Sequence, residues 1–120
     1  MVIASFRLFP AREQRKQFLS ILRAIQGPTR VQPHCVACQL YEEDDYEGSL
    51  LYLERWDSEP EFRCHACSDQ YRQILEAAEL SRRAPEIQFH QVSGTRGMDL
   101  LEELRGKNDG RGSLTQESEG

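Results

Sequence analysis

Residues 49–62, SLLYLERWDSEPEF, join a strand to a helix and decide the fold of this chain. The first eight are rich in Leu, Tyr and Trp, a composition typical of strands. A helix start follows. The Ser58 hydroxyl can cap a free backbone N–H, Glu61 can reach back toward it, and Pro60 suits a first turn. The sequence therefore predicts a strand that ends at Trp56 and a helix that begins at Ser58.

Three further elements are predicted upstream of this stretch. Cys35 to Glu42 reads as a strand, and the acidic turn at 43–48 is short enough to pair it with the next strand as an antiparallel hairpin. Val2 to Phe9 is a first strand, rich in β-branched and aromatic residues. Between these strands, apolar residues recur with a helical period at Phe18, Ile21, Leu22 and Ile25. Gly27-Pro28 is expected to end that helix, because proline cannot continue it.

Downstream, the helical spacing continues on a face that includes Phe62 and Ala66. A second cap at Ser68-Asp69 predicts that this helix is kinked or split in two. Its later part is marked by Tyr71, Ile74, Leu75 and Ala78, again at helical spacing. Glu86 to Ser93 alternates loosely and predicts a fourth strand. Met98 to Arg105 predicts a short helix, and residues 106–120 are too polar to offset their ordering entropy, so a disordered tail is expected.

The resulting order, β-α-β-β-α-β, predicts an α+β fold of ferredoxin-like topology, an antiparallel sheet with both helices on one face. Residues 1–97 would form this domain, followed by the short helix at 98–105 and the tail at 106–120. The strands are apolar on both faces: Leu51 and Leu53 alternate with Leu50 and Tyr52. Helices cover only one face, so a homodimer is expected to cover the other.

Composition narrows the classes of partner. A chain of 120 residues has room for one domain, and its net charge of −5 argues against nucleic acid or an anionic membrane surface. No apolar run approaches the ~18 residues that span a bilayer. The N-terminus has no basic region or cleavage site of a signal peptide. A cytoplasmic protein with reduced thiols is therefore expected.

The chain resembles the antibiotic-biosynthesis-monooxygenase family over roughly residues 2–93. The resemblance is carried by 56–62, WDSEPEF, with His65 and Ser68 after it, and by Pro33-His34-Cys35 at the start of the second strand. It implies a dimeric α+β barrel and a cofactor-independent monooxygenase of a small phenol- or quinol-type aromatic ligand, with no cofactor. The quinone-forming members use an Asn four residues before the Trp, where this chain has Tyr52.

The resemblance also places Trp56 and His65 in a pocket between the sheet and the helices. His65 is the candidate catalytic base, because the unperturbed pKa of histidine lies near neutrality. Aromatic side chains can stack on a flat ring, and a guanidinium can hold its anion. The expected substrate-binding residues are Trp56, Tyr52, Arg7, Arg55, Phe62 and Tyr71. The alternative, that His65 and Trp56 are ordinary packed residues, stays open at this point.

Four cysteines form two C-x₂-C pairs, which alone would indicate zinc. Cys64 and Cys67 share a helix face, but Cys35 and Cys38 on a strand have opposite parity and are expected on opposite faces. Buried and free thiols are the simpler interpretation. Two classes of function therefore remain: a small-molecule enzyme, or a non-catalytic dimeric domain that binds a ligand or, through these cysteines, a metal.

Overall fold

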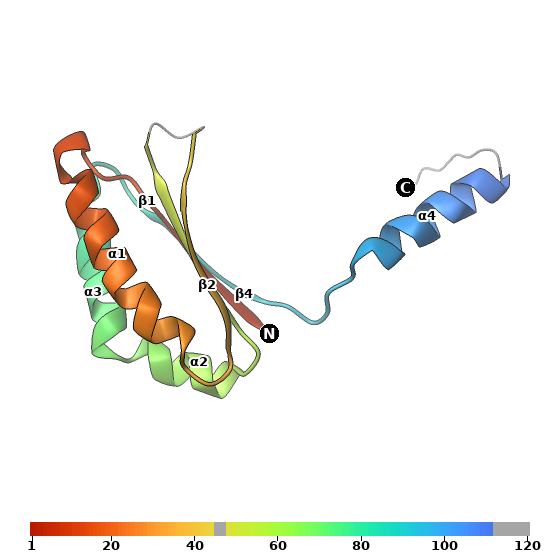
Figure 1. Ribbon diagram of the computed structural model, residues 1–120, viewed down its shortest axis with the longest axis horizontal. Coiled ribbons are helices and arrows are strands. Elements are labelled where there is room, and N and C mark those ends of the chain that lie inside the picture. Colours follow the sequence, from red (N-terminus) through yellow and green to blue (C-terminus); the bar gives the residue numbers. More distant parts are fainter. Residues whose placement is uncertain (45–47, 112–120) are drawn as a thin grey trace.

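The computed structural model describes residues 1–44 and 48–111, with side chains as far as residue 106. The elements, in chain order, are β1 (Val2–Leu8), η1 (Arg12–Gln14), α1 (Arg15–Arg30), β2 (Cys35–Glu42), β3 (Leu50–Trp56), α2 (Glu59–Ala66), α3 (Asp69–Glu79), β4 (Glu86–Gln91) and α4 (Met98–Arg111). The four strands form one sheet in the order β2-β3-β1-β4, and every neighbouring pair is antiparallel. Helices α1, α2 and α3 lie on one side of this sheet (Figure 1). The predicted ferredoxin-like α+β fold is confirmed.

The second helical region is split in two, because each half has its own cap. The Ser58 hydroxyl accepts a hydrogen bond from the backbone N–H of Glu61 at 3.4 Å, which starts α2. The Ser68 hydroxyl accepts one from the N–H of Tyr71 at 3.3 Å, which starts α3. Serine oxygens satisfy the free N–H groups of a helix start, so two such serines favour two helices over one.

The prediction that Gly27-Pro28 ends the first helix is wrong, since α1 continues to Arg30 with Pro28 inside its last turn. Proline removes one backbone hydrogen bond there. Burial offsets this loss: Ile25 and Thr29 are both buried against the sheet. The Thr29 hydroxyl also donates to the carbonyl of Ile25 at 2.8 Å. Tertiary packing of the last turn therefore overrides the local signal.

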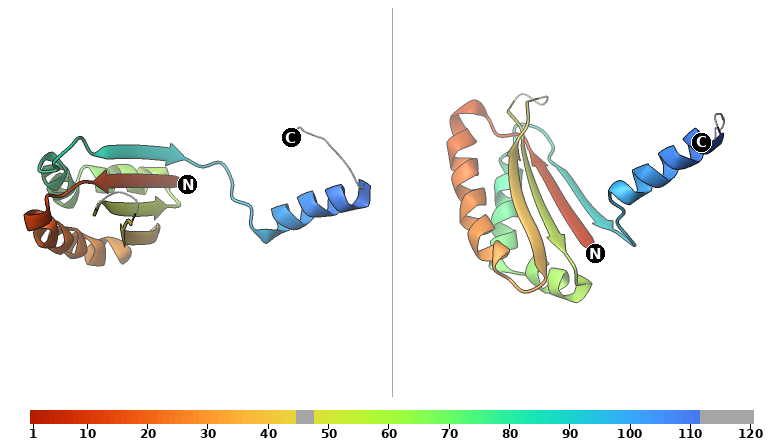
Figure 2. Two further views of the ribbon diagram at one scale, coloured as in Figure 1. Left: turned by 90° about the horizontal axis from the view of Figure 1, so that it is seen from above. Right: turned by 45° about the vertical axis from the view of Figure 1, so that its right-hand side comes forward.

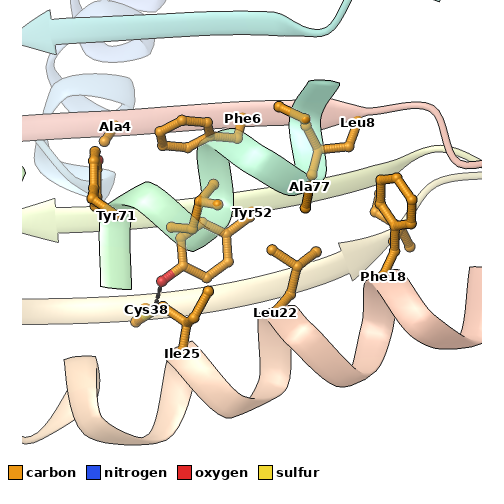
Figure 3. Packing of buried hydrophobic residues seen from close by; sticks show 13 residues of the cluster. Ala4, Phe6, Leu8, Phe18, Leu22, Ile25, Cys38, Tyr52, Tyr71 and Ala77 are labelled. Carbon is orange, nitrogen blue, oxygen red and sulfur yellow. Dashed lines mark hydrogen bonds between the residues drawn. The ribbon is translucent and has the colours of Figure 1, made fainter. Parts of the chain in front are cut away.

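The core lies between the sheet and its helices. Figure 3 shows side chains of β1 and β3 facing those of α1 and α3. Alternate residues of each strand point toward the helices, and the rows on β1 and β3 are buried along the whole strand. The largest fully buried side chains are Trp56, Tyr52, Phe6, Phe9, Phe18, Leu8, Leu22, Ile25, Leu50, Ile74, Glu54 and Thr29. Two of these twelve are polar, and one, Glu54, carries a titratable carboxyl group.

The opposite face of the sheet is not covered by α1, α2 or α3. Leu51 and Leu53 lie there, half-buried, opposite Arg7 and Ser5 on β1. At one end of this face, Arg7 pairs with Glu43 at 2.8 Å and with Glu86 at 2.7 Å. Apolar side chains on an uncovered face are those that the sequence predicts to meet a second copy.

Helix α4 begins at Met98 as predicted and extends to Arg111, six residues beyond the predicted end at 105. Residues 106–111 are therefore helical and not part of a tail. The rest of the predicted tail, 112–120, lies outside the described residues. Figures 1 and 2 show α4 standing clear of the domain, on the side of the sheet opposite to α1 and α3.

Candidate active site

The structure brings Trp56 and His65 together. Trp56 ends β3, and α2 begins three residues later and folds back over the sheet. His65 lies in the last turn of α2, with its ring centroid 4.9 Å from that of Trp56 and the two planes at 36°. Both side chains are buried. The predicted base therefore lies inside the domain, against the predicted ring-stacking residue.

A third residue, Glu54, joins them and was not predicted from the sequence. Its carboxylate is fully buried and accepts three hydrogen bonds at one point of the core. Trp56 Nε1 donates to Oε1 at 2.9 Å, and Tyr52 Oη donates to Oε2 at 2.8 Å. His65 Nε2 lies 3.3 Å from the same Oε2. We call Glu54, Tyr52, Trp56 and His65 the Glu54 network.

Strand geometry explains why three members of the network come from β3. Residues 52, 54 and 56 alternate with 51, 53 and 55, so they share the helix-facing side of the strand. A buried carboxylate is costly unless donors surround it. Here an indole, a phenol and an imidazole supply them. The sequence signal for Glu54 was its even spacing from Tyr52 and Trp56, but a glutamate on a strand is more often solvated.

The network continues to Cys38 on β2, whose thiol donates to Tyr52 Oη at 3.1 Å (Figure 3). Burial raises the pKa of Tyr52, and the neighbouring Glu54 carboxylate raises it further, so the phenol stays protonated and remains a donor. Burial likewise raises the pKa of the Cys38 thiol to about 12. Both groups are neutral at physiological pH and serve to orient the carboxylate.

Two buried polar atoms have no hydrogen-bond partner among the described residues: His65 Nδ1 and Tyr71 Oη. A carboxylate only accepts, so the neutral form of the His65 ring has its proton on Nε2, facing Glu54, and its lone pair on Nδ1. The Tyr71 ring packs edge-on against His65, with centroids 5.1 Å apart. Burial raises the pKa of Tyr71, so its hydroxyl is also a donor at physiological pH. With the neutral ring, an unused acceptor and an unused donor thus belong to two rings that pack against each other.

Aromatic side chains extend from this point to the surface. Phe62 packs on Trp56 and on Tyr71, with centroid distances of 6.5 and 6.3 Å. Phe89 on β4, which the sequence did not single out, lies 5.7 Å from Phe62 and is 54% exposed. Further along the same edge, a groove of about 510 Å³ runs between α3 and β4, and neither Phe89 nor any residue of the Glu54 network lines it. Its lining residues are Leu75, Ala78, Glu79, Ser81, Arg83, Ala84, Pro85 and Ile87.

The two predicted arginines do not reach the Glu54 network. Arg7 and Arg55 both have the parity of the uncovered face, so they lie across the sheet from His65. The Arg7 guanidinium binds Glu43 and Glu86. Arg55 is exposed. Neither guanidinium is placed to hold an anion beside His65, so this part of the predicted set is not brought together.

The expectation that Cys35 and Cys38 point to opposite faces is wrong. A bulge between Cys35 and Ala37 shifts the register with β3, so that Cys35 pairs with Trp56 and Cys38 with Glu54. An extra residue in one strand reverses the parity beyond it, and both thiols therefore face the helices. Cys64 and Cys67 are exposed, and all four cysteines are free. Within 1–44 and 48–106, no three His, Cys, Asp or Glu side chains are arranged to hold a metal ion.

The fold and the site define a ferredoxin-like α+β protein with a buried, hydrogen-bonded histidine between sheet and helices. The family model for antibiotic biosynthesis monooxygenase matches residues 1–77, more than half of the chain. The chain belongs to this family, whose members are typically small-ligand-binding dimers. The predicted family resemblance is thus confirmed.

Solved structures share the fold of this chain, and one curated protein is similar to it in sequence. Rv0793 from Mycobacterium tuberculosis is 26% identical, with a TM-score of 0.69, and the match covers 80% of this chain and 98% of that one. A Deinococcus radiodurans protein of the same family name has a TM-score of 0.72 at 20% identity, over 81% of this chain and 97% of that one; it supports the fold. An uncharacterised protein of Synechocystis sp. is 20% identical over 84 residues, 69% of this chain. The match covers 57% of that relative, so this chain spans little more than half its length.

No helix in the described part of the chain is long and apolar enough to cross a membrane.

Proposed function

We propose that this protein is a cofactor-independent monooxygenase that oxidises a small phenol or quinol with O₂, with His65 as the base. The observation that carries the proposal is the state of the His65 ring. Its Nε2 faces the Glu54 carboxylate at 3.3 Å, and its Nδ1 is buried without a partner. A histidine that is oriented by a carboxylate on one side and free on the other has the arrangement of a general base. Family membership supports the monooxygenase class.

The proposed reaction needs only the substrate and O₂. His65 Nδ1 takes the phenolic proton, and the phenolate, a better electron donor than the phenol, passes one electron to O₂. The resulting radical and superoxide combine, which forms a C–O bond at the ring, and His65 returns its proton to the peroxide. The ring hydrogen and hydroxide then leave as water as the O–O bond breaks, and a quinone carbonyl remains. O₂ is the oxidant, and the substrate supplies all the electrons.

Tyr71 and the aromatic residues would hold the substrate. The Tyr71 hydroxyl has no partner among the described residues and would donate to a substrate oxygen. The rings of Phe62 and Phe89 would pack on a flat substrate. The groove between α3 and β4, about 510 Å³, is within the 300–1,000 Å³ typical of small-molecule sites and would be the way in for the substrate. In this proposal Trp56 and Tyr52 act through Glu54, as positioning residues.

The proposal includes a homodimer in the cytoplasm. Leu51 and Leu53 on the uncovered face support the dimer. The four free cysteines fit a reducing compartment.

A non-catalytic ligand-binding domain is the alternative, and one observation favours it. Tyr52 stands where quinone-forming relatives are expected to carry an Asn, and its hydroxyl is already engaged by Glu54 and Cys38. A group that is fully used within the core cannot assist a reacting ring. In this alternative the same pocket binds an aromatic molecule without oxidising it.

Oxygen uptake with a dihydroxynaphthalene separates the two functions. The informative variant is His65→Gln, because the glutamine amide can still donate to Glu54 but offers no base. Wild-type uptake that is lost in His65→Gln, with ligand quenching of Trp56 fluorescence retained, supports the oxygenase. Equal uptake by both proteins would exclude His65 as the base. Quenching without uptake in the wild type would favour the ligand-binding alternative.

A further inference from the structure

Helix α4 presents apolar side chains that its own domain does not cover. Leu100, Leu101 and Leu104 fall within one stripe of the helix, at positions i, i+1 and i+4. They are 37%, 49% and 48% exposed, and Met98 is more exposed still. An exposed apolar stripe on a helix that does not pack on its own domain is typical of a protein–protein contact surface.

A second apolar surface lies at the edge of the domain, on α3 and β4. We call Leu75, Ile87 and Phe89 the α3–β4 patch. These side chains are 36–54% exposed. Leu75 and Ile87 line the groove between α3 and β4, and Phe89 follows Ile87 on the same side of β4. Ala78 and Pro85 line the same groove. The chain therefore carries two exposed apolar surfaces: the leucine stripe on α4, and the α3–β4 patch at the edge of the domain.

The position of α4 indicates where its partner surface lies. It stands on the uncovered side of the sheet, away from α1 and α3 (Figures 1 and 2). A second sheet that packs on this face lies about 10 Å away, and its helix layer about 10 Å further. The connection at 92–97 has six residues and can span about 20 Å when extended. Its reach thus matches the helix layer of a second copy.

We infer that α4 of one copy docks on the α3–β4 patch of a second copy and closes the groove between the partner's α3 and β4. The inference rests on the homodimer of the proposed function. A two-fold axis that crosses the strands would bring the end of one β4 beside the start of the partner's β4, where the groove lies. The exchange is reciprocal, so each groove would be closed by the other chain.

Photocrosslinking tests the contact directly in the full-length chain. Benzoylphenylalanine replaces Leu104, and unlabelled and ¹⁵N-labelled chains are mixed before irradiation. The expected products join position 104 to peptides of residues 75–89 of the other isotope label. Crosslinks found only within one label, with none between the two labels, would show docking on the chain's own groove and would overturn the inference. Crosslinks to another element, or none in a sample that is dimeric, would overturn it as well.

A matched pair of variants tests the energetic contribution. Leu101→Gln with Leu104→Gln should raise the dimer dissociation constant at least about tenfold, because buried leucines become polar in both copies. Glu102→Gln, on the opposite side of α4, should leave it within about twofold. An unchanged dissociation constant in the double variant would overturn the docking of α4 alone. A sedimentation mass near 13.9 kDa for the wild type would show that the protein is a monomer, which would overturn both the proposed dimer and this inference.

Discussion

The two faces of β3 differ in an unexpected way: one buries a carboxylate, and the other leaves leucines partly exposed. On the helix-facing side, Glu54 is fully buried and holds hydrogen bonds from Tyr52 and Trp56. On the other side, Leu51 and Leu53 remain partly exposed. An ordinary half-buried strand would place its leucines inside and its carboxylate outside. The helix-facing side therefore holds a buried polar network beside Leu50, and the other side leaves apolar surface partly exposed, which is the surface proposed to meet a second copy.

The largest effect is expected where the buried carboxylate is removed. Glu54→Ala leaves three donors without an acceptor and should lower the free energy of unfolding by about 3–5 kcal/mol. Urea denaturation followed by Trp56 fluorescence measures it. Arg55→Ala, the neighbour on the exposed face, is the control and should change stability by less than about 0.5 kcal/mol. Similar losses in both variants would contradict the contrast between the two faces.

A substitution on the uncovered face should weaken the dimer without unfolding the domain. Leu53→Asp places a charge where a second sheet is expected to pack, and should raise the dimer dissociation constant about a hundredfold or more. Sedimentation at several concentrations measures this constant, and circular dichroism checks that the fold is retained. A variant that stays as dimeric as the wild type would show that the partner does not lie on this face.

His65 should contribute less to stability than Glu54, because it supplies one donor to a carboxylate that has two others. His65→Ala should cost about 1–3 kcal/mol, the range for a buried hydrogen bond to a charged group. His65→Gln, which restores a donor, should recover part of that loss in the same urea titration. If His65→Gln is no more stable than His65→Ala, the contact with Glu54 does not stabilise the fold.

The smallest effect is a pH dependence from Cys38. Burial raises its pKa from 9.0 to about 12, so between these values the unfolded chain loses a proton that the folded chain keeps. The free energy of unfolding should therefore fall as the pH rises above about 9, by at most about 1 kcal/mol between pH 9 and pH 10, and this thiol should have no effect below about 9.

Comparison with Cys38→Ala isolates this slope from that of the buried tyrosines, whose pKa values are also raised. The exposed Cys64 provides the control, since Cys64→Ala should keep the wild-type slope. Identical slopes in all three proteins would show that the Cys38 thiol is not shielded as its burial implies.

Much of the fold could be predicted from local signals. Cys35 to Glu42 was expected as a strand and is one, and the caps at Ser58 and Ser68 marked both helix starts. The end of α1 could not be predicted, because the burial of Thr29 outweighs the effect of Pro28. Local rules describe what a segment prefers, and packing decides where these preferences are overruled.

The candidate site was predicted in part. Trp56, His65, Tyr52, Phe62 and Tyr71 were all expected near it, and the structure gathers them. Arg7 and Arg55 were expected too, but strand parity places them across the sheet. Glu54 was missed, because a sequence does not reveal that a carboxylate on a strand has three buried donors around it. Phe89 was missed because β4 lies beside Phe62 only after the chain has folded.

The sequence by itself determined the order of the elements, the two apolar faces and the family, since these follow from periodicity, caps and a short run of residues around Trp56. Tertiary structure alone decided the bulge that turned Cys35 and Cys38 to one face, the carboxylate that orients His65, and the side of the sheet on which α4 stands. The physical reason is that periodicity is a property of neighbours along the chain. Hydrogen bonds to a buried carboxylate and the register between strands arise between segments that meet only in the folded state.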